Sequence, residues 1–158
     1  MLGIDPSLSS TGFALVHFHK NQYSSLDLGE IKTKAARRLS ERLAIIFQEI
    51  TRLIKQHTPD QMAVEEVFYA ANPKIALLMG HARGAALVAA ANNNVPVMEY
   101  SPREIKMAVT GYGNASKEQV KRMVCTQIQL ESNSFGYDVF DALATAICHC
   151  HRTNGNKK

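Results

Sequence analysis

Apolar and polar positions alternate in different ways along the chain. Their order predicts three strands first, followed by helices that alternate with two further strands. Short apolar runs near the start are separated by turn residues, which is typical of neighbouring antiparallel strands. Further on, apolar residues recur at helical spacing with charged residues between them, which predicts an amphipathic helix over 37–57. The predicted strands cover 2–4, 11–18, 23–31, 62–67 and 95–100, and the other predicted helices cover 73–91, a short segment from 102, a segment from 117, and 137–152. The helix starts are predicted from an N-cap and proline at Asn72-Pro73 and from capping boxes over 101–104 and 116–119.

Length, charge and cysteine content limit the classes to which this protein can belong. The 158 residues are 46% hydrophobic and 20% charged, which fits a single α/β domain over 1–158 with a short flexible tail from about 153 to 158. Lys and Arg number 18 against 14 Asp and Glu, and this excess favours a polyanionic partner. Three cysteines without framework spacing fit a reducing, cytoplasmic compartment. No apolar run looks long enough to cross a membrane and no secretory signal is apparent, so no membrane partner is expected.

An aspartate follows the first predicted strand directly. Asp5 stands before a turn that contains Pro6, at the mouth of a buried strand. A carboxylate there is costly unless a cation or hydrogen-bond donors compensate it, which indicates that something positive binds it. The alternative is an Asx turn, in which Asp5 only caps the bend. This stretch alone leaves both interpretations open.

The fourth predicted strand carries two adjacent glutamates, Glu65 and Glu66. Successive side chains of a strand point to opposite faces, so only one of them can share a face with the apolar neighbour Ala63. An edge strand with two solvated acids is an equal alternative. The strand pattern does not decide between the two glutamates.

The last predicted helix begins with two further acids. A helical wheel places them on one side together with Thr145, Cys148, His149 and Arg152, and predicts that the opposite side faces the core with Val139, Leu143, Ala146, Ile147 and Cys150. Asp138 and Asp141 are three residues apart and therefore neighbours on the first turn, where the helix dipole favours negative charge. Ordinary N-terminal acids on a solvated face are the alternative interpretation. Near the end of the same helix, the Cys-His-Cys-His run over 148–151 looks like a metal tract, but consecutive helical residues point in different directions. We therefore expect that run to be structural.

Carboxylates without His or Cys partners are hard oxygen ligands, which suit magnesium or manganese and not zinc. A cluster of such acids suits hydrolysis at phosphorus with two metal ions about 3.5–4 Å apart. Neither a P-loop nor a dinucleotide-binding fingerprint is present. If the four acids gather in one site, the rest of the chain is more basic than its formal net charge of +4 indicates.

Four motifs in this order resemble the RuvC family of Holliday-junction resolvases. They are Gly3-Ile4-Asp5-Pro6 with Thr11-Gly12, Ala63-Val64-Glu65-Glu66-Val67-Phe68, Gly80-x-Ala82-Arg83-Gly84, and Asp138-x-x-Asp141-Ala142-Leu143-Ala144 with His149-Cys150-His151. The resemblance covers nearly the whole chain. It implies a ribonuclease-H-like fold, which is a five-stranded mixed sheet with its first three strands antiparallel and helices on both sides. It also implies a homodimer that nicks two strands of a four-way DNA junction symmetrically, in recombination and repair.

The resemblance assigns roles by position. Asp5, Glu65, Asp138 and Asp141 would be the catalytic carboxylates and would bind two Mg²⁺ ions, for which Mn²⁺ would substitute; the motif thus selects Glu65 over Glu66. The remaining roles concern DNA. Phe68 would stack on an unpaired base with Tyr69 beside it, and Lys106 and Lys117, both near predicted helix starts, would lie along the scissile strand.

Two departures and several alternatives accompany the resemblance. The family commonly has glycine where Ser7 stands, and some relatives have histidine where Asp141 stands. The resemblance places the protein on the bacterial nucleoid and leaves open whether RuvA and RuvB branch-migration proteins accompany it. Alternative classes are another ribonuclease-H-like nuclease acting on RNA or ribosomal precursors, a non-catalytic junction-binding module, and an actin- or sugar-kinase-like phosphate-binding domain. Small residues over 73–91 indicate either part of a dimer surface or tight packing within the monomer.

Overall fold

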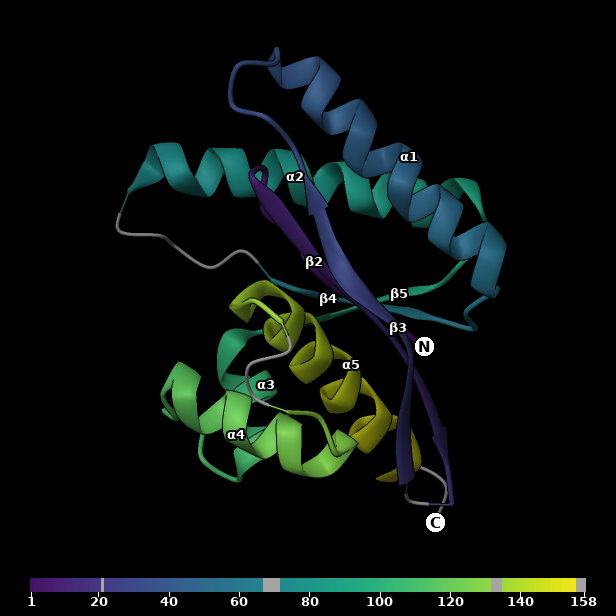
Figure 1. Cartoon of the computed structure of the whole chain (residues 1–158), viewed down its shortest axis with the longest axis vertical. Helices are drawn as coiled ribbons and strands as arrows, with labels where there is room; N and C mark the ends of the chain where they lie inside the picture. Colours follow the sequence, from purple (N-terminus) through teal and green to yellow (C-terminus); the bar gives the residue numbers. More distant parts are fainter. Residues whose placement is uncertain (21, 67–71, 132–134, 156–158) are drawn as a thin grey trace.

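The computed structural model describes residues 1–20, 22–66, 72–131 and 135–155 (Figure 1). Strands and helices follow each other in the predicted order, with boundaries that differ from the prediction by a few residues. The strands are β1 (Leu2–Asp5), β2 (Ser10–His19), β3 (Gln22–Lys32), β4 (Met62–Glu65) and β5 (Val97–Tyr100). The helices are α1 (Leu39–His57), α2 (Pro73–Asn92), α3 (Pro102–Thr110), α4 (Lys117–Ile128) and α5 (Tyr137–Gly155).

The strands form one five-stranded sheet in the order β3-β2-β1-β4-β5. β1 pairs antiparallel with β2, and β2 pairs antiparallel with β3, whereas β1–β4 and β4–β5 are parallel pairs. The predicted mixed sheet with three antiparallel strands at its start is therefore confirmed. β1 and β4 lie side by side with the same direction, so both end at the same edge of the sheet.

Helices cover both faces of the sheet. α1 and α2 lie on one face, and α3, α4 and α5 lie on the other (Figure 1). Each face has its own hydrophobic cluster, because alternate side chains of every strand point to opposite sides. In β1, for example, Leu2 and Ile4 belong to the cluster under α1 and α2.

The other face of the central strands is lined by very small residues, and α5 packs against it. A Cβ atom at Gly3 would overlap the carbonyl oxygen of Ala142, and one at Gly12 would overlap that of Asp138. Glycine within a strand often marks the close approach of another backbone, and these two positions are such cases. The missing side chains let the first half of α5 lie directly on β1 and β2.

α5 is buried on more sides than its wheel predicts. Thr145, Cys148 and His149 fall on the same side as the two aspartates, yet they are 1%, 0% and 3% exposed. α5 contacts α3 and α4 as well as the sheet, so little of its surface is left to solvent. His149 bridges Tyr100 Oη at 2.8 Å and Gln61 Oε1 at 2.6 Å, which agrees with the structural role expected for the Cys-His-Cys-His run. The helix extends to Gly155, into the predicted tail.

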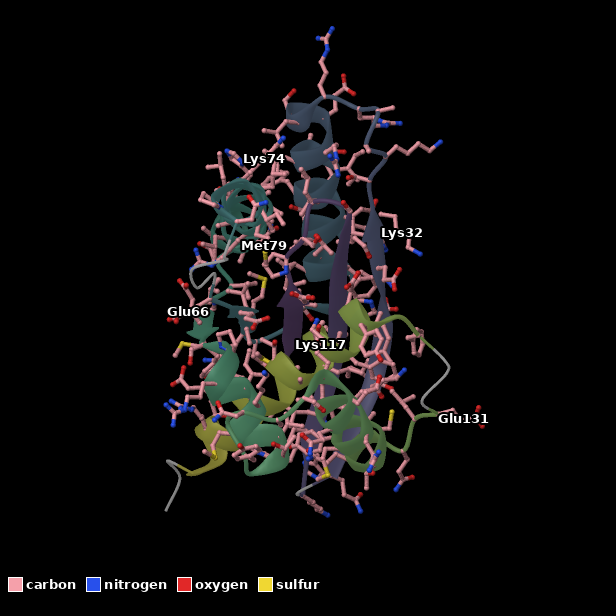
Figure 2. The ribbon with its side chains drawn as sticks, turned by 90° about the vertical axis from the view of Figure 1, so that its left-hand side faces the viewer. Lys32, Glu66, Lys74, Met79, Lys117 and Glu131 are labelled. Atoms are coloured by element: carbon pink, nitrogen blue, oxygen red, sulfur yellow. The ribbon has the colours of Figure 1, made fainter. Side chains whose placement is uncertain are left out.

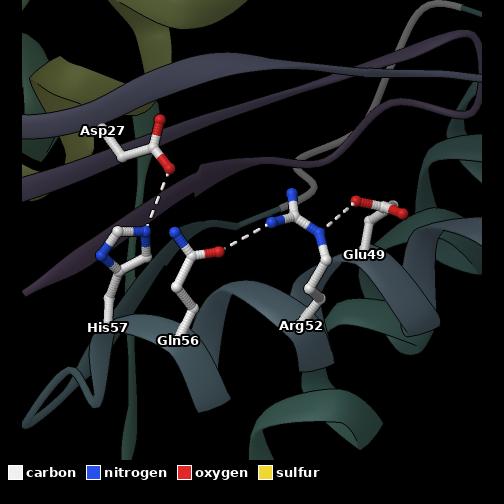
Figure 3. Close-up of polar contacts among 5 residues, drawn as sticks. All are labelled: Asp27, Glu49, Arg52, Gln56 and His57. Carbon is white, nitrogen blue, oxygen red and sulfur yellow. Dashed lines mark hydrogen bonds and ion pairs between the residues drawn. The ribbon is translucent and has the colours of Figure 1, made fainter.

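α1 has the amphipathic character that its spacing predicts. Its buried side is formed by Ile46, Ile50, Leu53 and Ile54. On the outer side, Arg52 donates to Glu49 and Gln56, each at 2.9 Å (Figure 3). At the end of the helix, His57 Nε2 lies 3.0 Å from Asp27 Oδ2, which ties α1 to β3 (Figure 3).

α2 packs on α1 along one side only. That side consists of Ala82, Ala86, Ala89 and Ala90, whereas a Cβ atom at Gly80 or Gly84 would meet nothing within 4 Å. Tight packing within the monomer therefore does not explain these two glycines. The helix also has a mean hydropathy of 1.3 and would be long enough to span a membrane by length and composition alone, with 22% of that stretch buried. The expectation that no apolar run is long enough was wrong here, because alanines raise the hydropathy without a run of large side chains.

Candidate active site

The carboxylates of Asp5 and Glu65 come from the ends of two neighbouring strands. Asp5 is the last residue of β1 and Glu65 the last residue of β4. The pairing of Ile4 with Val64 brings both acids to the same height at this edge of the sheet. Alternation along β4 places Glu65 on the face of Ala63, which is the face covered by α5.

The turn after Asp5 is not an Asx turn. Thr11 closes it, since the Thr11 hydroxyl donates to the carbonyl of Ser7 at 2.7 Å and accepts from the Ser7 N–H at 3.3 Å. Within the described residues, the Asp5 carboxylate has no hydrogen-bond donor of its own. The interpretation of Asp5 as a mere cap is therefore not supported.

A cavity of about 340 Å³ brings the strand acids together with the first turn of α5. Asp5, Glu65 and Asp141 line it, together with both predicted lysines. Asp138 is not among the lining residues, although its charge acts on Asp5. The full lining is Asp5, Ser7, Glu65, Met79, Pro102, Ile105, Lys106, Lys117, Val120, Asp141 and Ala144.

Burial and mutual repulsion raise the pKa values of the two strand acids. Burial, followed by the charges of Asp141, Glu65 and Asp138, raises the pKa of Asp5 to about 8. Burial and the charge of Asp141 raise the pKa of Glu65 to about 7. Lys117 opposes both shifts. Carboxylates in this situation ionise readily only when a further positive charge arrives.

Lys117 reaches the site from the first turn of α4. Ser116 and Gln119 form the predicted capping box, in which each side chain accepts from the backbone N–H of the other residue, and this fixes the start of the helix. From there, Lys117 Nζ donates to Asp141 Oδ2 at 2.8 Å, and this bond raises the pKa of the lysine. Figure 2 shows Lys117 in the middle of this face, below Met79.

Lys106 lines the same cavity from α3, whose predicted capping box between Ser101 and Glu104 is also present. Phe68 and Tyr69 lie outside the described residues. The structure therefore brings together three of the four predicted acids and both lysines, with the fourth acid close by.

The donor set fits hard divalent cations. Four carboxylates on or near one cavity, two of them with pKa values raised by burial and repulsion, match the oxygen ligands that magnesium and manganese prefer. As the side chains stand, no group of three or more acidic, His or Cys side chains in the described residues converges closely enough to hold an ion. At Asp141, the ammonium of Lys117 supplies the compensating charge instead.

Several lining residues escaped the sequence analysis. Met79 from α2, Ile105 from α3 and Val120 from α4 form an apolar wall opposite the acids. Nothing in the pattern distinguishes them from core residues. The glycines under α5 did carry a signal, because Gly3 and Gly12 interrupt strands whose other positions are mostly apolar.

A mixed sheet of this order, with acids at the ends of two central strands and on a packed helix, defines a metal-dependent nuclease of the ribonuclease-H-like class. The family model "Crossover junction endodeoxyribonuclease RuvC" matches residues 1–149. The chain therefore belongs to the RuvC family of endodeoxyribonucleases, and such nucleases depend on divalent metal ions.

Individual relatives agree with this assignment. The crossover junction endodeoxyribonuclease RuvC of Alkaliphilus oremlandii is 44% identical over 154 residues, covering 98% of this chain and 94% of the relative. That of Desulforamulus reducens is 45% identical over 149 residues, covering 94% and 91%. Among solved structures, Thermus thermophilus RuvC in complex with a Holliday junction substrate superposes with a TM-score of 0.92 at 32% identity, covering 98% of this chain and 94% of that one.

Proposed function

We propose that this chain resolves four-way DNA junctions by nicking two strands symmetrically, leaving 5′-phosphate and 3′-hydroxyl ends, in recombination and repair. The observation that carries the proposal is the single cavity in which acids from β1, β4 and α5 meet lysines from α3 and α4. The solved Thermus relative, described as bound to a Holliday junction, supports the choice of substrate.

The catalytic carboxylates in this proposal are Asp5, Glu65, Asp138 and Asp141, which would hold two Mg²⁺ ions or Mn²⁺ in their place. Bound ions of this kind activate water and stabilise the leaving oxygen in phosphodiester hydrolysis. The protein's part is to fix the acids: the ends of β1 and β4 hold two of them, and the close packing of α5 on the sheet holds the other two. Mn²⁺ is also a useful experimental probe of the same ligands.

The DNA contacts in this proposal come from two lysines and two aromatics. Lys117 is the first residue of α4, where an ammonium and free backbone N–H groups can bind phosphate together, and Lys106 lies one turn into α3 and lines the same cavity. Their role would be to hold the scissile strand over the acids. Phe68 and Tyr69 are proposed, from the family motif alone, to stack on bases at the junction.

A homodimer is part of the proposal, because two-fold symmetry matches the two strands to be cut. α2 supports it with a stripe on the side away from α1: Leu77 and Val88 are 62% and 52% exposed, and Gly80 and Gly84 lie between them at helical spacing. An exposed apolar stripe with glycines allows a second helix to approach closely. We further propose that the enzyme acts on the bacterial nucleoid in the cytoplasm, and a partnership with RuvA and RuvB stays a prediction.

The dimer is tested by Gly84→Glu, which adds bulk and charge where the monomer has open space. We expect sedimentation equilibrium to show a dimer for the wild type and for Gly84→Ala, and a monomer for Gly84→Glu with an unchanged circular dichroism spectrum. Paired nicking should be lost with the dimer. A wild type that is monomeric at micromolar concentration, with paired nicking retained, would contradict the proposal.

The substrate and the site are tested together with adjacent variants. Mg²⁺-dependent cleavage is measured on a four-way junction, a linear duplex and an RNA–DNA hybrid, with wild type, Glu65→Gln and Glu66→Gln. We expect paired nicks in the junction alone, lost in Glu65→Gln and kept in Glu66→Gln, because only Glu65 lines the cavity. Preferred cleavage of the hybrid would favour an RNA-directed nuclease, and equal loss in both variants would remove the distinction between the two glutamates.

A further inference from the structure

Lys117 occupies an unusual position for a residue that is proposed to bind DNA. Its ammonium is not directed toward solvent. Instead, Nζ donates a hydrogen bond at 2.8 Å to Asp141, which is one of the proposed metal ligands. The lysine side chain is 69% exposed and the aspartate 21% exposed, so the pair lies at the mouth of the cavity. Lys106, on the same cavity, has no carboxylate within ion-pair distance in the described part of the chain.

A divalent cation and this ammonium need the same oxygen atoms. An ion held by Asp141 would stand where the lysine's positive charge now compensates the carboxylate, and two cations at that spacing repel each other. The backbone of Lys117 cannot yield, because the capping box of Ser116 and Gln119 fixes it. The side chain can move, since it is long, flexible and mostly exposed.

We propose that Lys117 is a built-in competitor for the metal: it pairs with Asp141 in the metal-free enzyme and leaves Asp141 when a divalent cation binds there. This inference rests on the proposed function, which supplies the metal. As a consequence, metal binding is coupled to DNA binding, because the ammonium becomes available for the phosphates of the DNA strand only once the cation has taken its place at Asp141.

Metal binding without DNA tests the proposal. Mn²⁺ is titrated into wild type, Lys117→Met, Lys117→Arg and Lys106→Met. Binding is measured by isothermal titration calorimetry and from the electron paramagnetic resonance signal of free Mn²⁺. Loss of the competing ion pair should make Lys117→Met bind Mn²⁺ about three- to tenfold more tightly, as expected for an exposed pair. Lys117→Arg, which retains a cation at Asp141, should bind no more tightly than wild type.

Lys106→Met is the matched control. It removes the same charge from the same cavity without breaking an ion pair, so a general change in electrostatic potential would affect both variants alike. We expect its Mn²⁺ affinity to change less than about twofold. Equal tightening in Lys106→Met and Lys117→Met would overturn the proposal, as would an unchanged or weakened affinity in Lys117→Met.

Asp141→Asn separates this failure from a failure of the proposed function. If wild type binds Mn²⁺ and Asp141→Asn weakens that binding, the metal site stands, and an unresponsive Lys117→Met contradicts only the competition. If wild type binds no Mn²⁺, the metal site itself is wrong and the competition falls with it. Circular dichroism confirms that each variant is folded, which is expected because Lys117 is mostly exposed.

Discussion

The two faces of the sheet are built on opposite packing rules. On the face under α1 and α2, large aliphatic side chains such as Ile4 and Ile50 fill the space between helix and sheet and are fully buried. On the face under α5, glycines and alanines let helix backbone and strand backbone nearly touch. A single strand of four residues, β1, serves both: Leu2 and Ile4 point one way, and Gly3 and Asp5 the other.

Large buried side chains stand on both faces, with Phe140, Leu143 and Ile147 in the cluster on the α5 side, and they contribute most of the hydrophobic free energy. Volume-conserving exchanges among them are tolerated. The face under α5 fixes the distance between sheet and helix, and with it the distance between the acids of β1 and β4 and those of α5. Substitutions on the two faces should therefore fail in different ways.

The largest effect is expected from Asp5→Asn on the acid-bearing face. Loss of a metal ligand should remove several kcal/mol of transition-state stabilisation and slow junction cleavage by roughly a thousandfold or more. Junction binding, measured by gel shift in Ca²⁺ or EDTA, should remain or tighten, because the substitution removes an acid that repels the phosphate strand whenever it is ionised.

The neighbouring residue gives the matched control for Asp5→Asn. Ile4→Val, on the opposite face, should lower the free energy of unfolding by about 1 kcal/mol and leave cleavage unchanged. Undiminished cutting by Asp5→Asn would refute the assignment of that acid.

The next effect belongs to the face under α1. Ile50→Ala removes a fully buried side chain and leaves a cavity between α1 and the sheet. We expect urea denaturation to show a loss of about 2–5 kcal/mol. At a temperature where the variant is folded, cleavage per folded molecule should equal that of wild type; a matching loss of activity would mean that the two faces are coupled.

A pair of glycine substitutions sharpens the comparison. Gly12→Ala would force the first turn of α5 away from β2, because its Cβ atom meets the Asp138 carbonyl, and should cost about 1–3 kcal/mol of stability along with most of the cleavage rate. Gly84→Ala, in open space on α2, should leave stability unchanged or raise it by about 0.5–1 kcal/mol through helix propensity. Thermal denaturation and cleavage assays of both variants decide this, and equal effects would contradict the close-packing argument.

The smallest effect is a pH dependence of the metal-free protein. Since the folded pKa of Asp5 is raised to about 8 and that of Glu65 to about 7, folding favours their protonated forms. Their contribution to stability is fully present near pH 4 and is lost as the pH rises through 7 to 8.

The measurement compares wild type with Asp5→Asn in EDTA. Between pH 5 and 6.5 the free energy of unfolding of wild type should fall by roughly 1–2 kcal/mol more than that of the variant, and Mn²⁺ should restore it. Parallel curves for the two proteins would show that the pKa of Asp5 is not raised in the folded, metal-free protein.

The sequence was most informative where a residue pattern maps directly onto local geometry. The capping boxes at Ser101 and Ser116 and the proline start of α2 at Pro73 were predicted and are present. The order of the elements along the chain and the antiparallel start followed from the residue pattern, whereas the mixed five-stranded sheet was implied by the family resemblance. The features predicted from the residue pattern depend on neighbours in sequence, so a single chain can reveal them.

The parts that could not be predicted depend on contacts between distant elements. The helical wheel of α5 did not show that Thr145 and His149 would be buried, because a wheel contains no information about which distant elements pack on the helix; His149, for example, contacts Tyr100 and Gln61. The ion pair between Lys117 and Asp141 joins residues from different helices and has no pattern in sequence. For Asp138, the motif predicted a site residue, and the structure places it near the cavity without lining it.

The position of α5 after all five strands of the sheet has a consequence for biosynthesis. Asp5 and Glu65 emerge from the ribosome well before Tyr137 is added, and the strands that hold them can begin to pair while translation continues. Half of the proposed ligand set arrives only with the last helix. We therefore expect a nascent or prematurely terminated polypeptide that ends before Tyr137 to be unable to cut DNA.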